Sequence, residues 1–210
     1  MTTWFRSAAL LLLIAAVAVD ADAQMRKGKL GVGVAGGMFQ YSGGDYTLVT
    51  PKMAGGLSVT YNLLDYIGVR ALVGVGQFGY GESYTQLTFA NVYVTANMMP
   101  NSRFNPFVSV GGGYAYFDPL SNNGIPLMSG SVAKNDFPIS IGGGFDYFLS
   151  EFISISATAE YVLGRVDWYD GSNLKSGNDA LLRGGLEIRY YFFDQGFMTK
   201  MLEALKSRYE

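Results

Sequence analysis

The sequence predicts an all-β fold, an eight-stranded antiparallel transmembrane up-and-down β-barrel, and three observations support this prediction. Eight segments alternate apolar and polar residues with a period of two, the period of a β-strand. No charged residue stands in the middle of the apolar face of any of them, although 15% of the chain is charged. The chain also combines 28 glycines, 15 tyrosines and 14 phenylalanines with only 6 prolines. This composition suits small barrels, in which glycine lets strands bend and aromatic rings mark the membrane interfaces.

The N-terminal residues predict a signal peptide over residues 1–23. Arg6 precedes an apolar run over residues 8–19, and Ala21-Asp22-Ala23 supplies the small residues that signal peptidase prefers. The run is too short for a transmembrane helix, which needs roughly 20 residues, so a membrane anchor is the less favoured alternative. We therefore expect export, followed by a barrel over residues 24–193.

The eight predicted strands each carry one apolar face. In chain order these faces consist of Leu30, Val32, Val34 and Met38; Met53, Leu57, Val59 and Tyr61; Ile67, Val69, Ala71, Val73 and Val75; Ala90, Val92, Val94 and Ala96; Val108, Val110, Tyr114 and Tyr116; Ile139, Ile141, Phe145 and Tyr147; Ile153, Ile155, Ala157, Ala159, Tyr161 and Leu163; and Leu182, Gly184, Leu186, Ile188, Tyr190 and Phe192. The last strand carries Arg183, Glu187 and Arg189 on its other face. An apolar exterior over a charged interior is typical of a membrane barrel, because a sheet in hydrocarbon must close so that no backbone edge is left unpaired. The alternative, a soluble sandwich with the apolar faces in its core, leaves the signal peptide unexplained.

The predicted connections alternate in length. The short ones cover residues 62–65, 97–105 and 148–151, and the long ones cover residues 42–50, 118–136 and 167–178. Short turns face the periplasm in such barrels and long loops face outward, so both chain ends are expected in the periplasm. Residues 79–84 form a short outer connection, and we expect their two strands to project beyond the membrane as a hairpin.

Aromatic residues are expected to form two girdles at headgroup level, where rings with one polar edge are stable. The predicted periplasmic girdle consists of Tyr61, Tyr66, Phe107, Tyr147, Phe152, Tyr190 and Phe192, and the predicted outer girdle consists of Tyr41, Tyr80, Tyr84, Tyr116 and Trp168.

Three stretches carry a family resemblance: NVYVTAN at residues 91–97, NPFVSVGGGY at residues 105–114 and GGGFDYFLSEF at residues 142–152. They resemble the outer membrane β-barrel family, specifically the small eight-stranded class of outer membrane proteins A and X. The resemblance covers nearly the whole mature chain. It implies a barrel in the outer membrane of a Gram-negative bacterium, with membrane lipid, lipopolysaccharide and the barrel assembly machinery as partners, but it implies no activity.

The chain continues for 17 residues after Phe193, whereas barrels of this class often end on an aromatic residue. In this tail, Phe197, Met201, Leu202 and Leu205 fall on one stripe, which predicts a short periplasmic helix over residues 194–210. The expected position is against the periplasmic rim of the barrel, and the alternative is a docking segment for a periplasmic protein.

The composition argues against enzymatic chemistry. The chain contains no histidine and no cysteine, which removes Ser-His-Asp and Cys-His sites and the usual zinc ligands. Two G-x-G-x-x-G spacings, at residues 31–36 and 74–79, lie within strands rather than between a strand and a helix, so they are not dinucleotide sites. A net charge of −2 gives no reason to expect nucleic acid as a partner. We predict no catalytic residue, no cofactor and no metal.

Charged residues on the inner faces are the main candidate site. We expect a network in the lumen formed by Lys29, Arg70, Asp146, Glu160, Arg183, Glu187 and Arg189. Glu160 and Arg183 become cross-strand neighbours if the last two strands pair through a loop centred near Ser172 and Asn173. An unpaired charge inside a narrow barrel costs several kcal/mol, so these residues are predicted to form a salt-bridged plug.

Two functions are compatible with these features. The first is a non-enzymatic barrel with an envelope-structural or surface-interaction role, in which Leu120, Ile125, Leu127 and Met128 of the long loop 118–136 contact a partner. The alternative for that loop is packing on itself. The second function is a narrow channel for small or apolar solutes, with space left by inner-face glycines, namely Gly31, Gly33, Gly74, Gly76, Gly111, Gly113, Gly142 and Gly144. Phe39, Leu72 and Tyr93 on the same face would help to fill that space.

Overall fold

The computed structural model describes residues 27–42, 49–80, 82–128, 134–166, 169, 179–193 and 207. The predicted signal peptide lies outside these residues, and so does the predicted C-terminal helix apart from Ser207. Within the described residues, no helix is long and apolar enough to cross a membrane.

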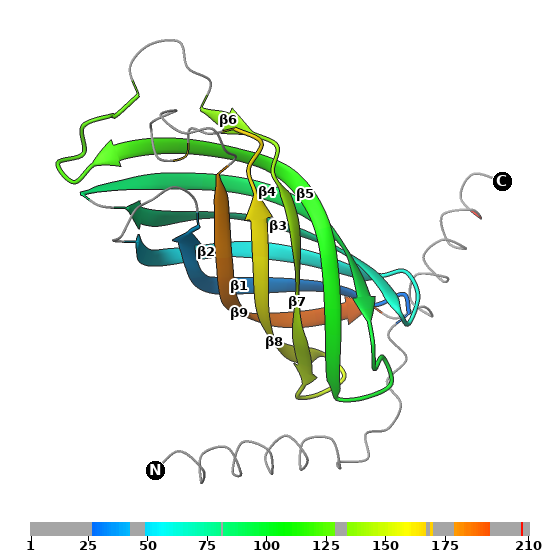
Figure 1. Cartoon of the computed structure of the whole chain (residues 1–210). Helices are drawn as coiled ribbons and strands as arrows, with labels where there is room; N and C mark the ends of the chain where they lie inside the picture. Colours follow the sequence, from blue (N-terminus) through cyan, green and yellow to red (C-terminus); the bar gives the residue numbers. More distant parts are fainter. Residues whose placement is uncertain are drawn as a thin grey trace, which may run out of the picture.

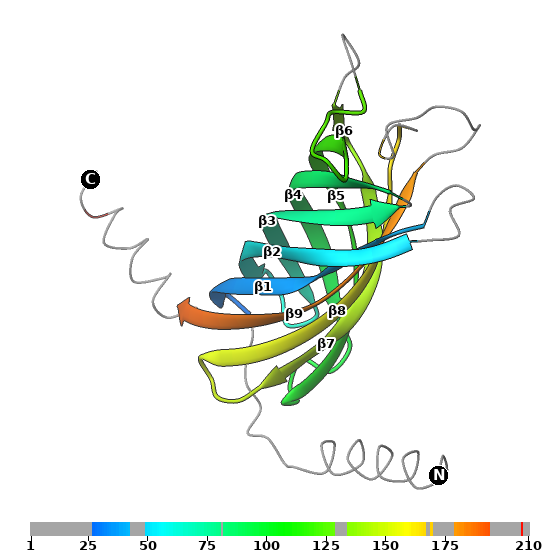
Figure 2. The same cartoon turned by 90° about the vertical axis from the view of Figure 1, so that its left-hand side faces the viewer.

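Eight long strands and one short strand form a single sheet (Figure 1). The strands are β1 (Leu30–Tyr41), β2 (Val49–Asn62), β3 (Ile67–Tyr80), β4 (Ser83–Asn97), β5 (Phe104–Ser121), β6 (Asn135–Asp136), β7 (Ile139–Phe148), β8 (Ile153–Leu163) and β9 (Ala180–Phe193). Each long strand pairs antiparallel with the next long strand along the chain, and β9 pairs with β1. Figure 2 shows β1 between β2 and β9, where the sheet closes. The predicted eight-stranded up-and-down barrel is therefore confirmed, and β6 is a two-residue addition beside the upper part of β5.

Side chains alternate between the lipid-facing exterior and the lumen, as the period of two predicts. The clearest case is β4, where burial alternates strictly from Thr85 to Asn97. Outward side chains such as Leu57, Val75 and Leu186 are 60 to 62% exposed. Because a pleated strand points successive side chains to opposite faces, the inward residues between them are buried. The barrel therefore presents a continuous apolar belt outside and a packed interior.

The connections separate by length to the two ends of the barrel, as expected (Figure 1). The short hairpin between β3 and β4 is also found, with only two residues between the strands. Two girdle assignments are wrong: Tyr41 and Phe107 are 2% and 4% exposed and point into the lumen. Height along the barrel axis puts both residues at an interface, but the alternation along each strand puts both on its inward face. The side chain of Tyr80 and all of Trp168 lie outside the described residues.

Candidate functional site

The lumen is filled by three successive layers of side chains, and this filled interior is the candidate functional site. The end with the long loops, which is the outer end in the expected orientation, holds an aromatic and aliphatic cluster, and the middle holds a network of buried charges. The end with the short turns, which is the periplasmic end in that orientation, holds asparagines and a second group of rings. The expectation of a lumen filled by salt bridges therefore describes only the middle layer.

Six of the seven predicted charged residues meet in the middle layer, each 3 to 7% exposed. They alternate in sign along one chain of contacts, in the order Arg183, Glu160, Arg70, Glu187, Arg189 and Asp146. Three guanidinium groups thus face three carboxylates, and the chain of contacts is neutral as a whole. Neutrality matters here because an isolated charge in a low-dielectric interior costs several kcal/mol.

Glu160 is the centre of the upper half of this network. Its Oε1 accepts a hydrogen bond from Arg70 Nη2 at 3.0 Å, and its Oε2 accepts one from Arg183 Nη2. Glu160 on β8 and Arg183 on β9 are direct cross-strand partners, whereas Arg70 reaches across the lumen from β3. Arg183 also donates to the hydroxyl of Tyr93. One carboxylate thus binds two arginines from opposite walls.

Glu187 and Asp146 complete the lower half of the network around Arg189. Glu187 Oε2 lies 3.5 Å from Arg70 Nη1, and its Oε1 accepts from Arg189 Nε at 2.7 Å. Arg189 Nη1 donates to Asp146 Oδ1 at 3.0 Å. Ser58 and Ser156 donate their hydroxyl groups to Glu187 and Asp146 respectively. The carboxylates are therefore satisfied by more than their ion pairs.

Arginine faces join the charge network to the outer layer. The guanidinium carbon of Arg183 lies 5.0 Å from the ring centre of Phe89, and that of Arg70 lies 5.0 Å from the ring centre of Tyr93. Cation–π contacts of this kind contribute about 0.5–2 kcal/mol each. The edges of each guanidinium bind carboxylates while its faces pack on rings.

Lys29 lies apart from this network. Its Nζ donates to the backbone carbonyl of Glu151, in the turn between β7 and β8, at 3.3 Å. Lys29 precedes the first residue of β1, so the alternation of the strand does not fix its direction. Its place at the rim therefore differs from the predicted place in the lumen.

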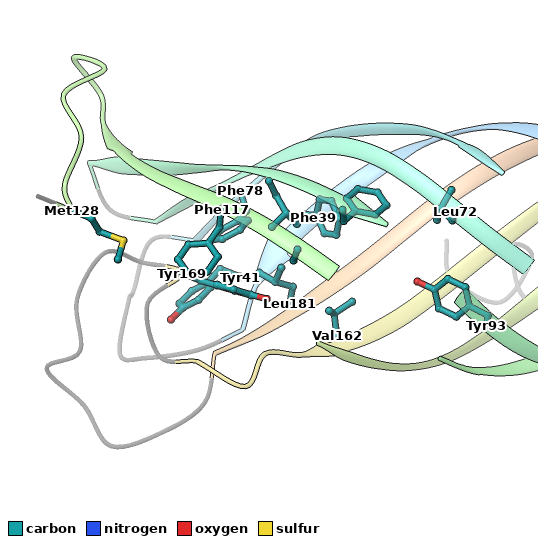
Figure 3. Close-up of a cluster of buried hydrophobic side chains, with 13 residues drawn as sticks. Phe39, Tyr41, Leu72, Phe78, Tyr93, Phe117, Met128, Val162, Tyr169 and Leu181 are labelled. Carbon is teal, nitrogen blue, oxygen red and sulfur yellow. The ribbon is translucent and has the colours of Figure 1, made fainter. Parts of the chain in front are cut away.

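Tyr169 closes the outer end of the lumen. It belongs to the connection between β8 and β9, is 0% exposed, and packs against Phe117 and Phe78 at ring-centre distances of 4.8 and 6.3 Å (Figure 3). Tyr41 stacks on Phe78 with ring centres 5.7 Å apart. Met128, from the loop after β5, lies in the same cluster. Rings from three strands and one loop thus fill the mouth.

Buried polar groups fix Tyr169 in this position. Its hydroxyl donates to Asp136 Oδ2 at 2.8 Å, its backbone N–H donates to Asp179 Oδ2 at 2.7 Å, and its carbonyl accepts from the Thr85 hydroxyl. Burial, followed by the negative charge of Asp136, raises the pKa of the Tyr169 phenol well above its usual value. The phenol therefore stays protonated, and remains a hydrogen-bond donor, at neutral and mildly alkaline pH.

Tyr169 is not identifiable from the sequence pattern. It belongs to the predicted outer loop 167–178, and a loop has no residue period that indicates burial. The available signal was indirect: Asp136 and Asp179 stand at strand ends next to a loop that contains aromatic residues. Carboxylates at such positions often receive hydrogen bonds from nearby loop groups.

The inner-face glycines do not leave open space, so that expectation is wrong. A Cβ added at Gly33 would stand 2.6 Å from Glu187 Oε1, and one added at Gly76 would stand 2.7 Å from the ring of Phe39. Similar contacts with large inner side chains occur at Gly31, Gly74, Gly111, Gly113 and Gly142. These glycines provide the room that their bulky neighbours occupy.

In the part of the chain that the structure describes, Arg70 borders two small cavities. The outer cavity is about 30 Å³ and is also bordered by Leu72 and Phe89. The periplasmic cavity is about 10 Å³ and is bordered by Thr60 and Asp146. A single water molecule needs roughly 10–15 Å³, so these cavities hold water at most.

The four predicted contact residues of the long outer loop separate into two pairs. Ile125 and Leu127 are 63% and 41% exposed, whereas Leu120 and Met128 are buried. Leu120 pairs with Pro126, and the backbone turns back at Gly124, which has a φ of 74°. The start of the loop therefore folds on itself and exposes two of its four apolar side chains.

Among the residues described, no group of three acidic side chains has the arrangement of a metal site.

Comparisons with known proteins agree with this architecture. A model of the outer membrane protein beta-barrel domain matches residues 8–182. No curated protein sequence matches the chain. Among solved structures, the attachment invasion locus protein Ail of Yersinia pestis is similar with a TM-score of 0.54 and 14% identity, over 79% of this chain and 99% of Ail. Neisserial surface protein A gives a TM-score of 0.56 and 12% identity, over 78% and 97% of the two chains. The outer membrane protein OprG of Pseudomonas aeruginosa gives a TM-score of 0.52 and 15% identity, over 82% of this chain and 100% of OprG. At these identities the structures establish the shared fold.

Proposed function

The chain belongs to the outer membrane protein beta-barrel domain family, and on this premise we propose that it is a non-enzymatic barrel with a closed lumen that acts at the outer surface of the membrane. The family places the protein in the bacterial outer membrane. The proposed orientation puts the short turns and both chain ends in the periplasm, because short periplasmic turns and long outer loops are the rule in such barrels.

The filled lumen is the observation that carries this proposal. A solute crossing the barrel has to displace Tyr169 from its ring cluster, separate Glu160 from two arginines, and pass the stacked rings of Phe148 and Tyr191 at the periplasmic end. The two cavities on this route are water-sized. An eight-stranded barrel is just wide enough for side chains to fill it, and here they do so at three levels.

The outer end offers surfaces for a partner. The β5 strand is the longest, at 18 residues, and the loop that follows it exposes Ile125 and Leu127. Exposed apolar side chains on an ordered loop are typical of contact surfaces. The Yersinia pestis protein of this fold is described as an attachment invasion locus protein, so the fold is compatible with work at the cell surface. The proposed partner is an extracellular protein.

The absence of histidine and cysteine from the sequence supports a non-enzymatic role. The acidic residues that remain inside the barrel are bound to arginines, serines or tyrosine. A general base must be able to reach a substrate, and these carboxylates lie in a filled interior.

Single-channel conductance in a planar bilayer tests the closed lumen. The purified barrel is refolded, its folding is checked by the change in gel mobility on heating, and its conductance is compared with that of a Tyr169→Ala, Glu160→Ala variant. Silence of the unmodified barrel supports the proposal, and activity in the variant shows that the assay detects opening. Steady conductance of the unmodified barrel overturns the proposal and favours a narrow channel, for which the two cavities beside Arg70 are the structural argument.

A further inference from the structure

The three short turns of the barrel expose large apolar side chains. Leu63 and Leu64 lie between β2 and β3, Met98 and Met99 lie between β4 and β5, and Leu149 lies between β7 and β8. All five are 46 to 57% exposed. Tight turns usually carry glycine, proline, asparagine, aspartate or serine, which suit the turn backbone and leave no large apolar side chain in water. These five side chains, the apolar turn tips, are therefore an unusual feature of this end of the barrel.

Charged residues in the same turns keep them out of the hydrocarbon. Asp65 and Glu151 belong to two of the turns, and Arg103 belongs to the third. The Asp65 carboxylate accepts a hydrogen bond from the backbone N–H of Lys27 at 3.1 Å. Because a charged side chain is costly in hydrocarbon, the turns lie at the level of the lipid headgroups or beyond it. Lipid tails therefore do not cover the apolar turn tips.

The chain leaves the barrel among these turns. β9 ends at Phe193, which pairs with Leu30 of β1, and the N–H of Tyr191 donates to the carbonyl of Phe152 beside the β7–β8 turn. Figure 1 shows the arrow tip of β9 at the same end of the barrel as the three turns. Around the wall, β4 is four long strands away from β9 in either direction. The β4–β5 turn therefore lies across the mouth from Phe193.

The residues that follow Phe193 are numerous enough to cross this mouth. Eight strands about 4.8 Å apart and tilted by about 40° close into a cylinder roughly 16 Å across. Helical residues advance by about 1.5 Å each, so Leu205 would lie about 18 Å from Phe193 along a helix. Leu205 belongs to the apolar stripe predicted for the tail. The stripe thus reaches the turn on the far side of the mouth.

We propose that residues 194–206 cross this end of the barrel as a helix and cover the apolar turn tips, with Leu205 against Met98 and Met99. The apolar stripe of the tail then faces the turns, and Glu203, on the opposite side of the helix, faces water. A segment tethered at the rim has a high effective concentration there, which favours it over a separate protein. This contact does not require a closed lumen, so it stands or fails independently of the conductance test.

Cysteine cross-linking of the refolded barrel tests the contact, because the chain has no cysteine of its own. The Met98→Cys, Leu205→Cys variant is expected to form an intramolecular disulfide under mild oxidation, since a disulfide requires Cα atoms within about 7 Å of each other. The Met98→Cys, Glu203→Cys variant carries its second thiol on the opposite side of the helix and is expected to give little disulfide in the same time. Equal yields would mean that the tail does not dock with one face. No disulfide in either variant would leave the turn tips to lipid headgroups or to another protein, and either result overturns the proposal.

Trypsin cleavage in detergent gives a second measurement, because the tail contains a cleavage site after Lys200. The Met98→Ser, Met99→Ser variant removes two apolar turn tips and is expected to be cleaved about tenfold faster, which corresponds to a lost contact free energy of about 1.4 kcal/mol. The Ile125→Ser, Leu127→Ser variant removes two exposed apolar side chains at the other end of the barrel and is expected to be cleaved like the unmodified chain. Identical cleavage of the two variants, each checked for folding by gel mobility, contradicts the proposed contact.

Discussion

Glu160 on β8 and Arg183 on β9 are direct cross-strand partners whose side chains meet inside the barrel, where Glu160 also binds Arg70 from the opposite wall. Loss of Glu160 breaks two ion pairs at once. Replacing it leaves the buried Arg183 without a carboxylate and leaves Arg70 with Glu187 alone, whereas replacing one of these arginines leaves Glu160 with the other.

Glu160→Ala is therefore expected to lower the free energy of unfolding by about 3–5 kcal/mol, the usual effect of breaking a buried ion pair from one side. Adding Arg183→Ala is expected to recover part of this loss, because the guanidinium that lost its carboxylate is then removed. Urea unfolding of the single and double variants in lipid vesicles gives the coupling energy, expected at about 1–3 kcal/mol. Strictly additive losses would show that the two residues do not interact.

Tyr169 is expected to stabilise the outer end of the barrel through both its ring and its hydroxyl. Tyr169→Ala removes the ring that packs on Phe117 and is expected to cost about 3–5 kcal/mol. Tyr169→Phe keeps the ring but leaves Asp136 with one donor fewer, at an expected cost of about 1–3 kcal/mol. Unfolding free energies of the two variants measure this difference. If both variants match the unmodified barrel, the loop does not dock in the mouth.

The raised pKa of Tyr169 predicts a loss of stability at alkaline pH. In the unfolded chain the phenol ionises around its ordinary pKa of 10.0, whereas the folded barrel keeps it protonated to higher pH. Above pH 10 the unfolded state therefore binds fewer protons, and the free energy of unfolding falls as pH rises, by about 1.4 kcal/mol per pH unit for one group. Tyr169→Phe removes this contribution but leaves every other tyrosine. The difference in stability between the two proteins should accordingly shrink above pH 10, and a constant difference would contradict the shifted pKa.

Replacement by valine should lower the stability of the barrel at one glycine of β1 and leave it nearly unchanged at another. Gly33→Val places a methyl-bearing carbon 2.6 Å from Glu187 Oε1 and 2.7 Å from Ser58 Oγ, and overpacking of this kind costs about 1–3 kcal/mol. Gly36→Val projects into open space on the outer face and is expected to change stability by no more than about 0.5 kcal/mol. Thermal or urea unfolding distinguishes the two. Equal effects would mean that the interior near Gly33 is loosely packed.

The sequence predicted the features that depend on a local period. The alternation of apolar and polar residues predicts the strands and their faces. Counting residues along the last two strands predicts Glu160 opposite Arg183, and the observed register confirms this pair. The same counting does not reveal which strands face each other across the lumen, so the contacts of Arg70 with Glu160 and Glu187 were not specified. Those contacts depend on how the sheet curls.

Features that interrupt the period were not predictable from it. A β-bulge at Lys52, between Pro51 and Ala54 of β2, changes the face of a single side chain, and Lys29 precedes its strand. Tyr169 is placed by hydrogen bonds to carboxylates that are distant in sequence. Inner-face glycines indicate free space when each strand is considered alone, but large side chains from neighbouring strands occupy that space. Each of these differences arises from tertiary packing that overrides a local pattern.

The buried arginine–carboxylate chain also constrains how the barrel enters the membrane. Arg70 comes from the third strand, whereas Glu160 and Glu187 come from the eighth and ninth labelled strands. A hairpin that contains Arg70 and inserts without β8 and β9 carries an uncompensated charge, since Glu160 lies 90 residues further along the chain and Glu187 lies further still. Hydrocarbon thus penalises a partly inserted sheet that contains Arg70 without β8 and β9, and the penalty disappears when the barrel closes. The β8–β9 hairpin holds two arginines and two glutamates of the network and is neutral by itself. Arg70 on β3 gains its carboxylates only from that hairpin, so insertion of the first half of the barrel is coupled to closure with the second.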